Sequence, residues 1–192
     1  MTMQSSETTK KTDASSPRYG AGLQKIVVSV GVGKMRGANA AQFDEKTLPA
    51  IIAECAKIVG QRPSVTKAKK SIAGFKVRQG DVVGIRATLR GVRMRDFLAR
   101  LVNAALPRIR DFRGIALSSV DAHGALSVGI REHIVFPETN PETADVVFGV
   151  EVTLVPATRN REKALDFYHS IGLPLARSED EKKKGPRRRG AE

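Results

Sequence analysis

Residues 82–90 read Val82-Val83-Gly84-Ile85-Arg86-Ala87-Thr88-Leu89-Arg90 and set the pattern of the predicted sheet. Apolar side chains alternate there with a polar set, Arg86, Thr88 and Arg90. Because successive side chains of a β-strand point to opposite faces, the stretch predicts a strand over 82–90 with one buried and one polar side. Residues 25–30 repeat the pattern, with Lys25 and Ser29 on the polar side. The two strands predict a sheet with helices packed on one face and a polar, basic face open to a partner.

The rest of the chain supplies helices for the apolar face. Apolar residues recur at helical spacing over 43–59, with Pro49 expected in the first turns, and over 93–105, with Pro107 after the end. A third helix is expected from Asn160, a suitable N-cap, to Gly172. Further strands are predicted over 63–69 and 146–155. Strands and helices mix without a regular βαβ repeat, which favours an α+β fold with a largely antiparallel sheet.

Length and composition favour a single domain between two tails. A chain of 192 residues that is 41% hydrophobic can bury one core. Residues 1–20 are rich in Ser, Thr and Lys and are predicted to be disordered, so the folded domain is expected over 21–176. Residues 177–192 carry an acidic triplet and then two basic triplets. This segment is either a solvated tail or an additional arm that contacts phosphates.

Cysteine usage and hydropathy predict a cytoplasmic protein. Cys55 is the only cysteine, which excludes an internal disulfide and fits a reducing compartment. No apolar run approaches the ~20 residues that cross a bilayer, and no secretory signal pattern opens the chain. We therefore expect no membrane partner.

The positive charge is concentrated in the middle of the chain. Residues 61–113 hold fourteen Lys or Arg and three acidic residues, a net +11 of the +13 of the whole chain. Such a segment repels itself unless an anionic partner neutralises it. Nucleic acid, and RNA above all, is the expected partner. An anionic membrane fits less well, because the charge lies in strand and turn patterns and not on one amphipathic helix.

A phosphate-loop candidate fails on spacing. Gly31-Val32-Gly33-Lys34 follows a strand, but a Walker loop needs glycine where Val28 stands and Ser or Thr where Met35 stands. A dinucleotide fingerprint needs its third glycine where Arg36 stands. A nucleotide-using enzyme therefore rests on a near match alone, and tight-turn glycines are the better interpretation.

Other catalytic and metal-binding patterns are also weak. Three histidines lack metal-ligand spacing: His123, His133 and His169. Cys55 lies on the apolar stripe of a predicted helix, which favours a buried structural thiol over a nucleophile. We expect no enzyme, no metal and no cofactor.

Four ordered blocks carry a family resemblance. They are Gly60-Gln61-Arg62-Pro63 with the run Thr66-Lys67-Ala68-Lys69-Lys70-Ser71-Ile72-Ala73-Gly74-Phe75-Lys76-Val77-Arg78-Gln79-Gly80; Leu89-Arg90-Gly91-Val92-Arg93-Met94; Leu106-Pro107-Arg108-Ile109-Arg110-Asp111-Phe112-Arg113-Gly114; and Val128-Gly129-Ile130-Arg131-Glu132-His133-Ile134-Val135-Phe136-Pro137-Glu138. Together they resemble bacterial large-subunit ribosomal protein five, the family that binds 5S ribosomal RNA (rRNA) in the central protuberance. The similarity extends over roughly residues 25–175.

The resemblance implies an RNA site on the open sheet face and its neighbouring turns. The implied 5S rRNA-binding residues are Lys25, Ser29, Gln61, Thr66, Arg86, Thr88 and Arg90. The alternation described above places five of them on one face.

The resemblance also implies that residues 70–81 form a projecting loop that touches the elbow of P-site transfer RNA (tRNA). The implied contact residues are Lys70, Ser71, Ile72, Ala73, Gly74, Phe75, Lys76 and Arg78. Cations there would meet phosphates, and Gly74 would permit a tight tip. Phe75 would either stack on a splayed base or pack into the base of the loop.

A third implied surface is a bridge to the small subunit through its protein thirteen, formed by Arg110, Asp111, Phe112, Pro137 and Glu138. The expected partners are 5S rRNA, 23S rRNA, P-site tRNA, that small-subunit protein and neighbouring proteins of the central protuberance. The expected function is a structural ribosomal protein that anchors 5S rRNA without catalysis. The alternative is a free-standing RNA-binding regulator built on the same domain.

Two features depart from the family pattern. The family usually opens with a helix before the first strand, and residues 1–19 carry no such pattern. Ser29 stands where asparagine is usual; it keeps a hydroxyl but lacks the paired donor and acceptor of an amide, which predicts a weaker RNA contact. The basic tail is additional to the usual family end and could compensate.

Overall fold

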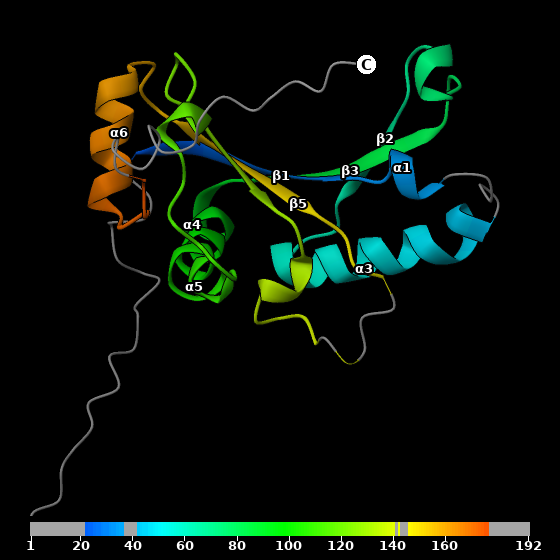
Figure 1. Cartoon of the computed structure of the whole chain (residues 1–192), viewed down its shortest axis with the longest axis horizontal. Helices are drawn as coiled ribbons and strands as arrows, with labels where there is room; N and C mark the ends of the chain where they lie inside the picture. Colours follow the sequence, from blue (N-terminus) through cyan, green and yellow to red (C-terminus); the bar gives the residue numbers. More distant parts are fainter. Residues whose placement is uncertain (1–21, 37–41, 141, 143–145, 177–192) are drawn as a thin grey trace, which may run out of the picture.

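The computed structural model describes residues 22–36, 42–140, 142 and 146–176, so the predicted tails over 1–20 and 177–192 lie outside the described residues. The described residues form a five-stranded sheet of order β2-β3-β1-β5-β4 in which all neighbours are antiparallel (Figure 1). The strands are β1 Leu23–Gly31, β2 Ser64–Lys67, β3 Val82–Leu89, β4 Leu126–Ile130 and β5 Val150–Pro156. The α+β prediction is confirmed.

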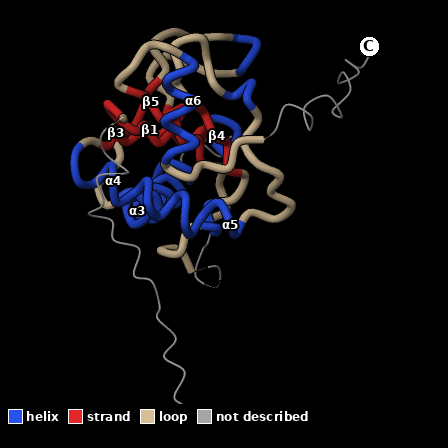
Figure 2. The backbone as a smooth tube through the Cα atoms, turned by 90° about the vertical axis from the view of Figure 1, so that its left-hand side faces the viewer, coloured by secondary structure: helices blue, strands red, loops and turns tan. Residues whose placement is uncertain are grey.

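Helices cover one face and one end of this sheet. They are α1 Gly33–Arg36, α3 Leu48–Val59, α4 Gly91–Arg100, α5 Leu106–Arg108 and α6 Arg161–Ser170. Figure 2 shows α3, α4 and α5 on the same side of the strands, while α6 crosses the end of the sheet opposite the one beside α1. Short 3-10 turns occur at Ala73–Phe75, Leu117–Ser119 and His133–Val135.

The core lies between the sheet and helices α3 and α4. The inward residues of β1 and β3 are buried: Ile26, Val28, Val30, Ile85, Ala87 and Leu89. The apolar side chains of the predicted helices belong to the same buried cluster and include Ile51, Ile58, Phe97, Leu98 and Leu101. Cys55 is part of this core, and burial raises the pKa of its thiol to about 11, so it is the structural thiol that the sequence indicated.

Two helical segments widen just before a proline. Phe43–Thr47 and Leu101–Ala105 are π-helical turns, and Pro49 and Pro107 each follow two residues later. Proline lacks an N–H, and its ring crowds the carbonyl one turn earlier, so a wider turn lets the helix continue through it. The expectation that Pro107 follows the helix end is therefore wrong, because it lies in the last turn, α5.

Strand β4 was not predicted from the sequence, and β5 begins later than predicted. β4 alternates buried Leu126, Val128 and Ile130 with exposed residues, a signal only five residues long. Residues 146–149 lie outside the sheet, although strand was predicted there. Phe148 instead pairs with His133, whose main-chain N–H donates to the Phe148 oxygen at 3.0 Å. Their rings stack with centroids 4.0 Å apart.

Helix α6 is tied to the sheet end by a cap and a buried phenol. The predicted N-cap is confirmed, since the Asn160 side chain accepts a hydrogen bond from the Glu162 N–H at 2.9 Å. Tyr168 is fully buried, and its hydroxyl donates to the Gly124 carbonyl at 2.7 Å. Gly124 has φ +84°, and a Cβ there would lie 2.6 Å from the Ala164 Cβ. The turn before β4 therefore requires glycine.

Candidate nucleic-acid interface

The sheet face away from α3 and α4 carries small and polar side chains. One line of paired residues crosses all five strands in the order Ser64, Arg86, Ser29, Glu151 and Gly129. Each of these residues is exposed or half-buried, in contrast to the buried alternate positions. A parallel line contains Thr88, Val27, Thr153 and Ser127. Because most of these side chains are short, a flat partner can approach the backbone of the strands closely.

The structure brings several predicted 5S rRNA residues onto this face. Ser29 and Arg86 are direct cross-strand partners, and Lys25 lies two pleats from Ser29 on the same side of β1. Thr66 pairs with Gly84, nearer the end of the sheet from which the 70–81 loop projects. Lys25 and Arg86 supply positive charge, and Glu151 supplies one negative charge.

The amide of Gln61 is used inside the protein. Its Nε2 donates to the main-chain oxygen of Thr88 at 3.1 Å, and its Oε1 accepts a bond from the guanidinium of Arg93 at 3.3 Å. Gln61 therefore joins the end of β3 to the start of α4 and fixes an exposed arginine there. Arg90 is exposed beside them. Sequence reasoning left Arg93 out of the site; its position off the apolar stripe of the helix was the available signal.

Residues 70–81, called the finger below, form an ordered hairpin extension of β2 and β3 (Figure 1). Ile72 and Val77 exchange main-chain bonds at 2.9 and 3.3 Å, and the Ser71 hydroxyl accepts a bond from the Gln79 N–H at 2.9 Å. At the root, the Ala68 N–H donates to the main-chain oxygen of Asp81 at 2.8 Å. The predicted loop therefore has internal hydrogen bonds that hold its shape.

The tip of the finger exposes apolar side chains. Phe75 is 78% exposed and Ile72 is 50% exposed. Of the two alternatives for Phe75, packing into the base of the loop is therefore wrong, and the ring is free to stack on a partner. The left-handed residue of the tip is Lys76, with φ 54°, and not Gly74, which lies in the 3-10 turn. Gly74 therefore does not set the turn, although we expected it to.

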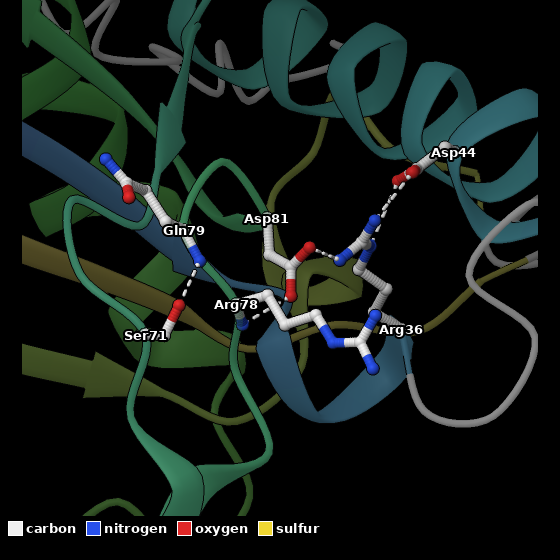
Figure 3. A network of polar contacts seen from close by, with 6 residues as sticks. All are labelled: Arg36, Asp44, Ser71, Arg78, Gln79 and Asp81. Atoms are coloured by element: carbon white, nitrogen blue, oxygen red, sulfur yellow. Dashed lines mark hydrogen bonds and ion pairs between the residues drawn. The ribbon is translucent and has the colours of Figure 1, made fainter.

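Arg36 ties the root of the finger to the body of the domain (Figure 3). Its guanidinium lies 2.6 Å from an Asp81 carboxylate oxygen and 3.0 Å from one of Asp44. The other Asp81 oxygen accepts a bond from the Arg78 N–H at 2.7 Å. That backbone hydrogen bond, together with Arg36, holds the pKa of Asp81 below its usual value. The predicted loop boundary at Asp81 therefore coincides with an electrostatic anchor.

A groove of about 700 Å³ opens between the 108–111 turn and the 129–135 segment. Arg110 and Asp111 line one wall, and Ile134 and Val135 line the other. Of the predicted bridge residues, Arg110 and Asp111 thus line the groove, whereas Phe112, Pro137 and Glu138 are not among its lining residues. Phe112 is half-buried against the core, and Pro137 is exposed.

Glu138 has an intramolecular partner. Its carboxylate forms an ion pair with Arg100, which also donates to the Ile58 carbonyl at 3.1 Å. This contact joins the segment after β4 to the ends of α3 and α4. Of the five predicted bridge residues, Glu138 is the one whose charge is already compensated within the described part of the chain.

Candidate metal sites and membrane spans are absent from the described ranges. No group of three or more His, Cys, Asp or Glu residues there has an arrangement that could hold a metal ion. Among the same residues, no helix has the length and apolar character needed to cross a bilayer. His133 is a buried core residue, whereas His123 and His169 are exposed.

Known proteins match both halves of the domain. The sequence pattern of the family described as ribosomal protein L5 matches residues 21–78, and the pattern of the C-terminus of the same ribosomal family matches residues 82–175. A large ribosomal subunit protein uL5 from Chloroflexus aggregans is 47% identical over 80% of this chain and 82% of that protein. The proteins of the same name from Carboxydothermus hydrogenoformans and Halothermothrix orenii are 44% and 43% identical over 81% and 80% of this chain, and over 83% and 82% of their own lengths.

Proposed function

Because this chain belongs to the ribosomal protein L5 family, whose members are structural constituents of the large ribosomal subunit, we propose that its open sheet face anchors 5S rRNA in the central protuberance. The family places the chain in the ribosome, which is cytoplasmic in bacteria, and among rRNA-binding structural proteins that are not enzymes. The finer assignments below are proposals about particular surfaces.

The pairing of Ser29 with Arg86 carries the 5S rRNA proposal. These two side chains occupy the two neighbouring strands β1 and β3 of a face that α3 and α4 leave open. The guanidinium of Arg86 can bind a phosphate with two parallel hydrogen bonds, and the hydroxyl of Ser29 can donate to a phosphate or to a ribose oxygen. Such contacts position an RNA backbone without reading bases, which suits a protein that binds RNA by its shape.

The finger is proposed to contact the elbow of P-site tRNA. It extends beyond the sheet, its main chain is hydrogen-bonded internally, and its tip combines exposed Phe75 with the cation of Lys76. An exposed ring next to a cation suits an unstacked base beside a phosphate.

The groove between 108–111 and 129–135 is proposed as the contact with small-subunit protein thirteen. Its mixed charge, with Arg108 and Arg131 on one hand and Asp111 and Glu132 on the other, suits a polar intersubunit contact. The surfaces that remain would face 23S rRNA and neighbouring proteins of the central protuberance.

Binding of the full chain to 5S rRNA tests the proposal. If about seven cations meet phosphates, the logarithm of the affinity should fall with the logarithm of salt concentration at a slope of roughly −5. An unrelated RNA hairpin of similar length should bind much more weakly. Equal affinity for the two RNAs would remove the specific claim. Loss of the chain from large subunits in a salt wash that leaves other proteins bound would favour the free-standing regulator.

A further inference from the structure

Arg36 is placed where three separate parts of the chain meet. It ends the short helix α1, which is held to the start of β3 by the Val32 N–H donating to the Val83 oxygen at 3.1 Å. Its guanidinium contacts Asp44, in a turn anchored by buried Phe43, and Asp81, at the root of the finger. Figure 3 shows the guanidinium between the two carboxylates. Neither the sequence motifs nor the family resemblance assigned this arginine a role.

The arrangement uses the planar fork of arginine. Nε and Nη2 face the Asp44 carboxylate at 3.4 and 3.0 Å, while Nη1 faces Asp81 at 2.6 Å. A single ammonium group could not reach both carboxylates with this geometry, because its donors radiate from one nitrogen.

The finger does not need Arg36 for its internal structure. The Ala68 N–H donates to the main-chain oxygen of Asp81, and the Gly80 N–H donates to the main-chain oxygen of Ala68 at 2.9 Å. The two sides of the root are therefore joined by main-chain hydrogen bonds. Loss of Arg36 would therefore release the finger as a unit from the body and would leave its own hydrogen bonds in place.

From this geometry we infer that Arg36 is a positioning residue that fixes the direction in which the finger projects. The inference rests on the proposed role of the finger in contacting tRNA. Arg36 itself contacts no RNA and acts through Asp81. By holding the finger in one direction before tRNA binds, it lowers the conformational entropy that the finger loses on binding. The three side chains are partly exposed, so added salt weakens the anchor.

A distance measurement on the full chain tests this directly. Spin labels at Ala73→Cys on the finger and Ala53→Cys on the exposed face of α3 report the finger direction, while buried Cys55 stays unlabelled. Arg36→Gln should widen the distance distribution about twofold, and Arg36→Lys should lie between it and the parent chain. Lys34→Gln, which removes one exposed charge from the same helix, should leave the width unchanged.

Two results would overturn the inference. One is equal widths for Arg36→Gln and Lys34→Gln. The other is faster hydrogen exchange of the Ile72 and Val77 amides in Arg36→Gln, because that would mean that the finger unfolds and does not swing. Both variants lose one positive charge. A fall in melting temperature that they share therefore reflects the lost charge and not the loss of the Arg36 contacts.

A second assay separates this inference from the proposed function. In ribosomes that carry each chain, Arg36→Gln should speed P-site tRNA dissociation roughly two- to fivefold, with 5S rRNA affinity unchanged. If Phe75→Ala has no effect in that assay, the tRNA role of the finger is wrong, while the distance distributions still decide whether Arg36 positions it. If Phe75→Ala has an effect and Arg36→Gln has none, positioning by Arg36 is wrong.

Discussion

Ser29 and Arg86 face each other across β1 and β3, on the sheet face that α3 and α4 leave open. Members of the family that the sequence resembles usually carry asparagine at the position of Ser29. A serine hydroxyl is shorter than an amide and makes fewer hydrogen bonds, so this pair is expected to hold RNA less firmly than the family pattern would.

Ser29→Asn should therefore strengthen 5S rRNA binding. One added hydrogen bond contributes about 0.5–1.5 kcal/mol, equivalent to roughly two- to tenfold in affinity. Filter binding or fluorescence anisotropy with the full chain measures the change. Ser170→Asn adds the same amide to an exposed position at the end of α6, outside the sheet, and serves as the control. Equal gains for both variants would point to a general polar effect and not to the Ser29 position.

Charge reversal on the finger should separate the two proposed RNA partners. Lys76→Glu with Arg78→Glu puts negative charge where phosphates are expected and should weaken the tRNA contact about tenfold or more, with 5S rRNA affinity nearly unchanged. Crosslinking yields to P-site tRNA and a parallel 5S rRNA titration measure the two effects. An equal loss of both would show that the finger is assigned to the wrong partner.

Gly124→Ala should destabilise the domain. The added methyl group would lie 2.6 Å from the Ala164 Cβ, and the residue has φ +84°, which an L side chain rarely adopts. We expect a loss of about 2–4 kcal/mol in the free energy of unfolding, measured by urea denaturation. Gly31→Ala is the matched control, because nothing lies within 4 Å of its added Cβ. A similar cost for both variants would contradict this explanation of the β4 turn.

His133 should make stability depend on pH below neutrality. It is fully buried, and burial lowers the pKa of its imidazole, against smaller opposite effects of Glu54 and of the Phe148 amide. The unfolded chain therefore binds a proton near pH 6.5 that the folded chain does not. The stability gained by keeping His133 neutral in the folded chain is fully present above about pH 6.5. It is lost as the pH falls toward the folded pKa, by at most about 1.4 kcal/mol per pH unit.

Unfolding curves between pH 7 and pH 5 measure this dependence. Replacing His133 by Gln should flatten it in that window, whereas His123→Gln, on an exposed turn, should keep the slope of the parent chain. Parallel slopes for all three proteins would mean that other groups control the acid response.

The alternation over 82–90 predicted more of the fold than any other stretch, because burying one face of a strand fixes which side chains point inward. Together with the alternation over 25–30, it predicted which side chains of β1 and β3 are buried. β4 was missed because it is five residues long and has Gly129 within it, so its alternation was too brief to recognise.

The site was less predictable than the fold, because its critical contacts join residues that are far apart in the chain. Gln61 and Arg93 are 32 positions apart, and only folding brings the end of α3 and the start of α4 together. The anchoring of Asp81 by Arg36 is of the same kind: in the sequence, each residue alone looks like an ordinary surface charge. The exposure of Phe75 also depended on the conformation of the tip, which residue types alone left open between two alternatives.

The affinity of the full chain for 5S rRNA, compared between Arg86→Gln and Arg159→Gln, decides whether the open sheet face binds this RNA. Both variants remove one exposed arginine, but only Arg86 lies on the open sheet face, while Arg159 lies in the loop before α6. We predict about tenfold weaker binding for Arg86→Gln, with a salt slope shallower by roughly 0.7, and little change for Arg159→Gln beyond the loss of one distant charge. Equal affinities of the two variants would contradict the assignment of the sheet face to 5S rRNA.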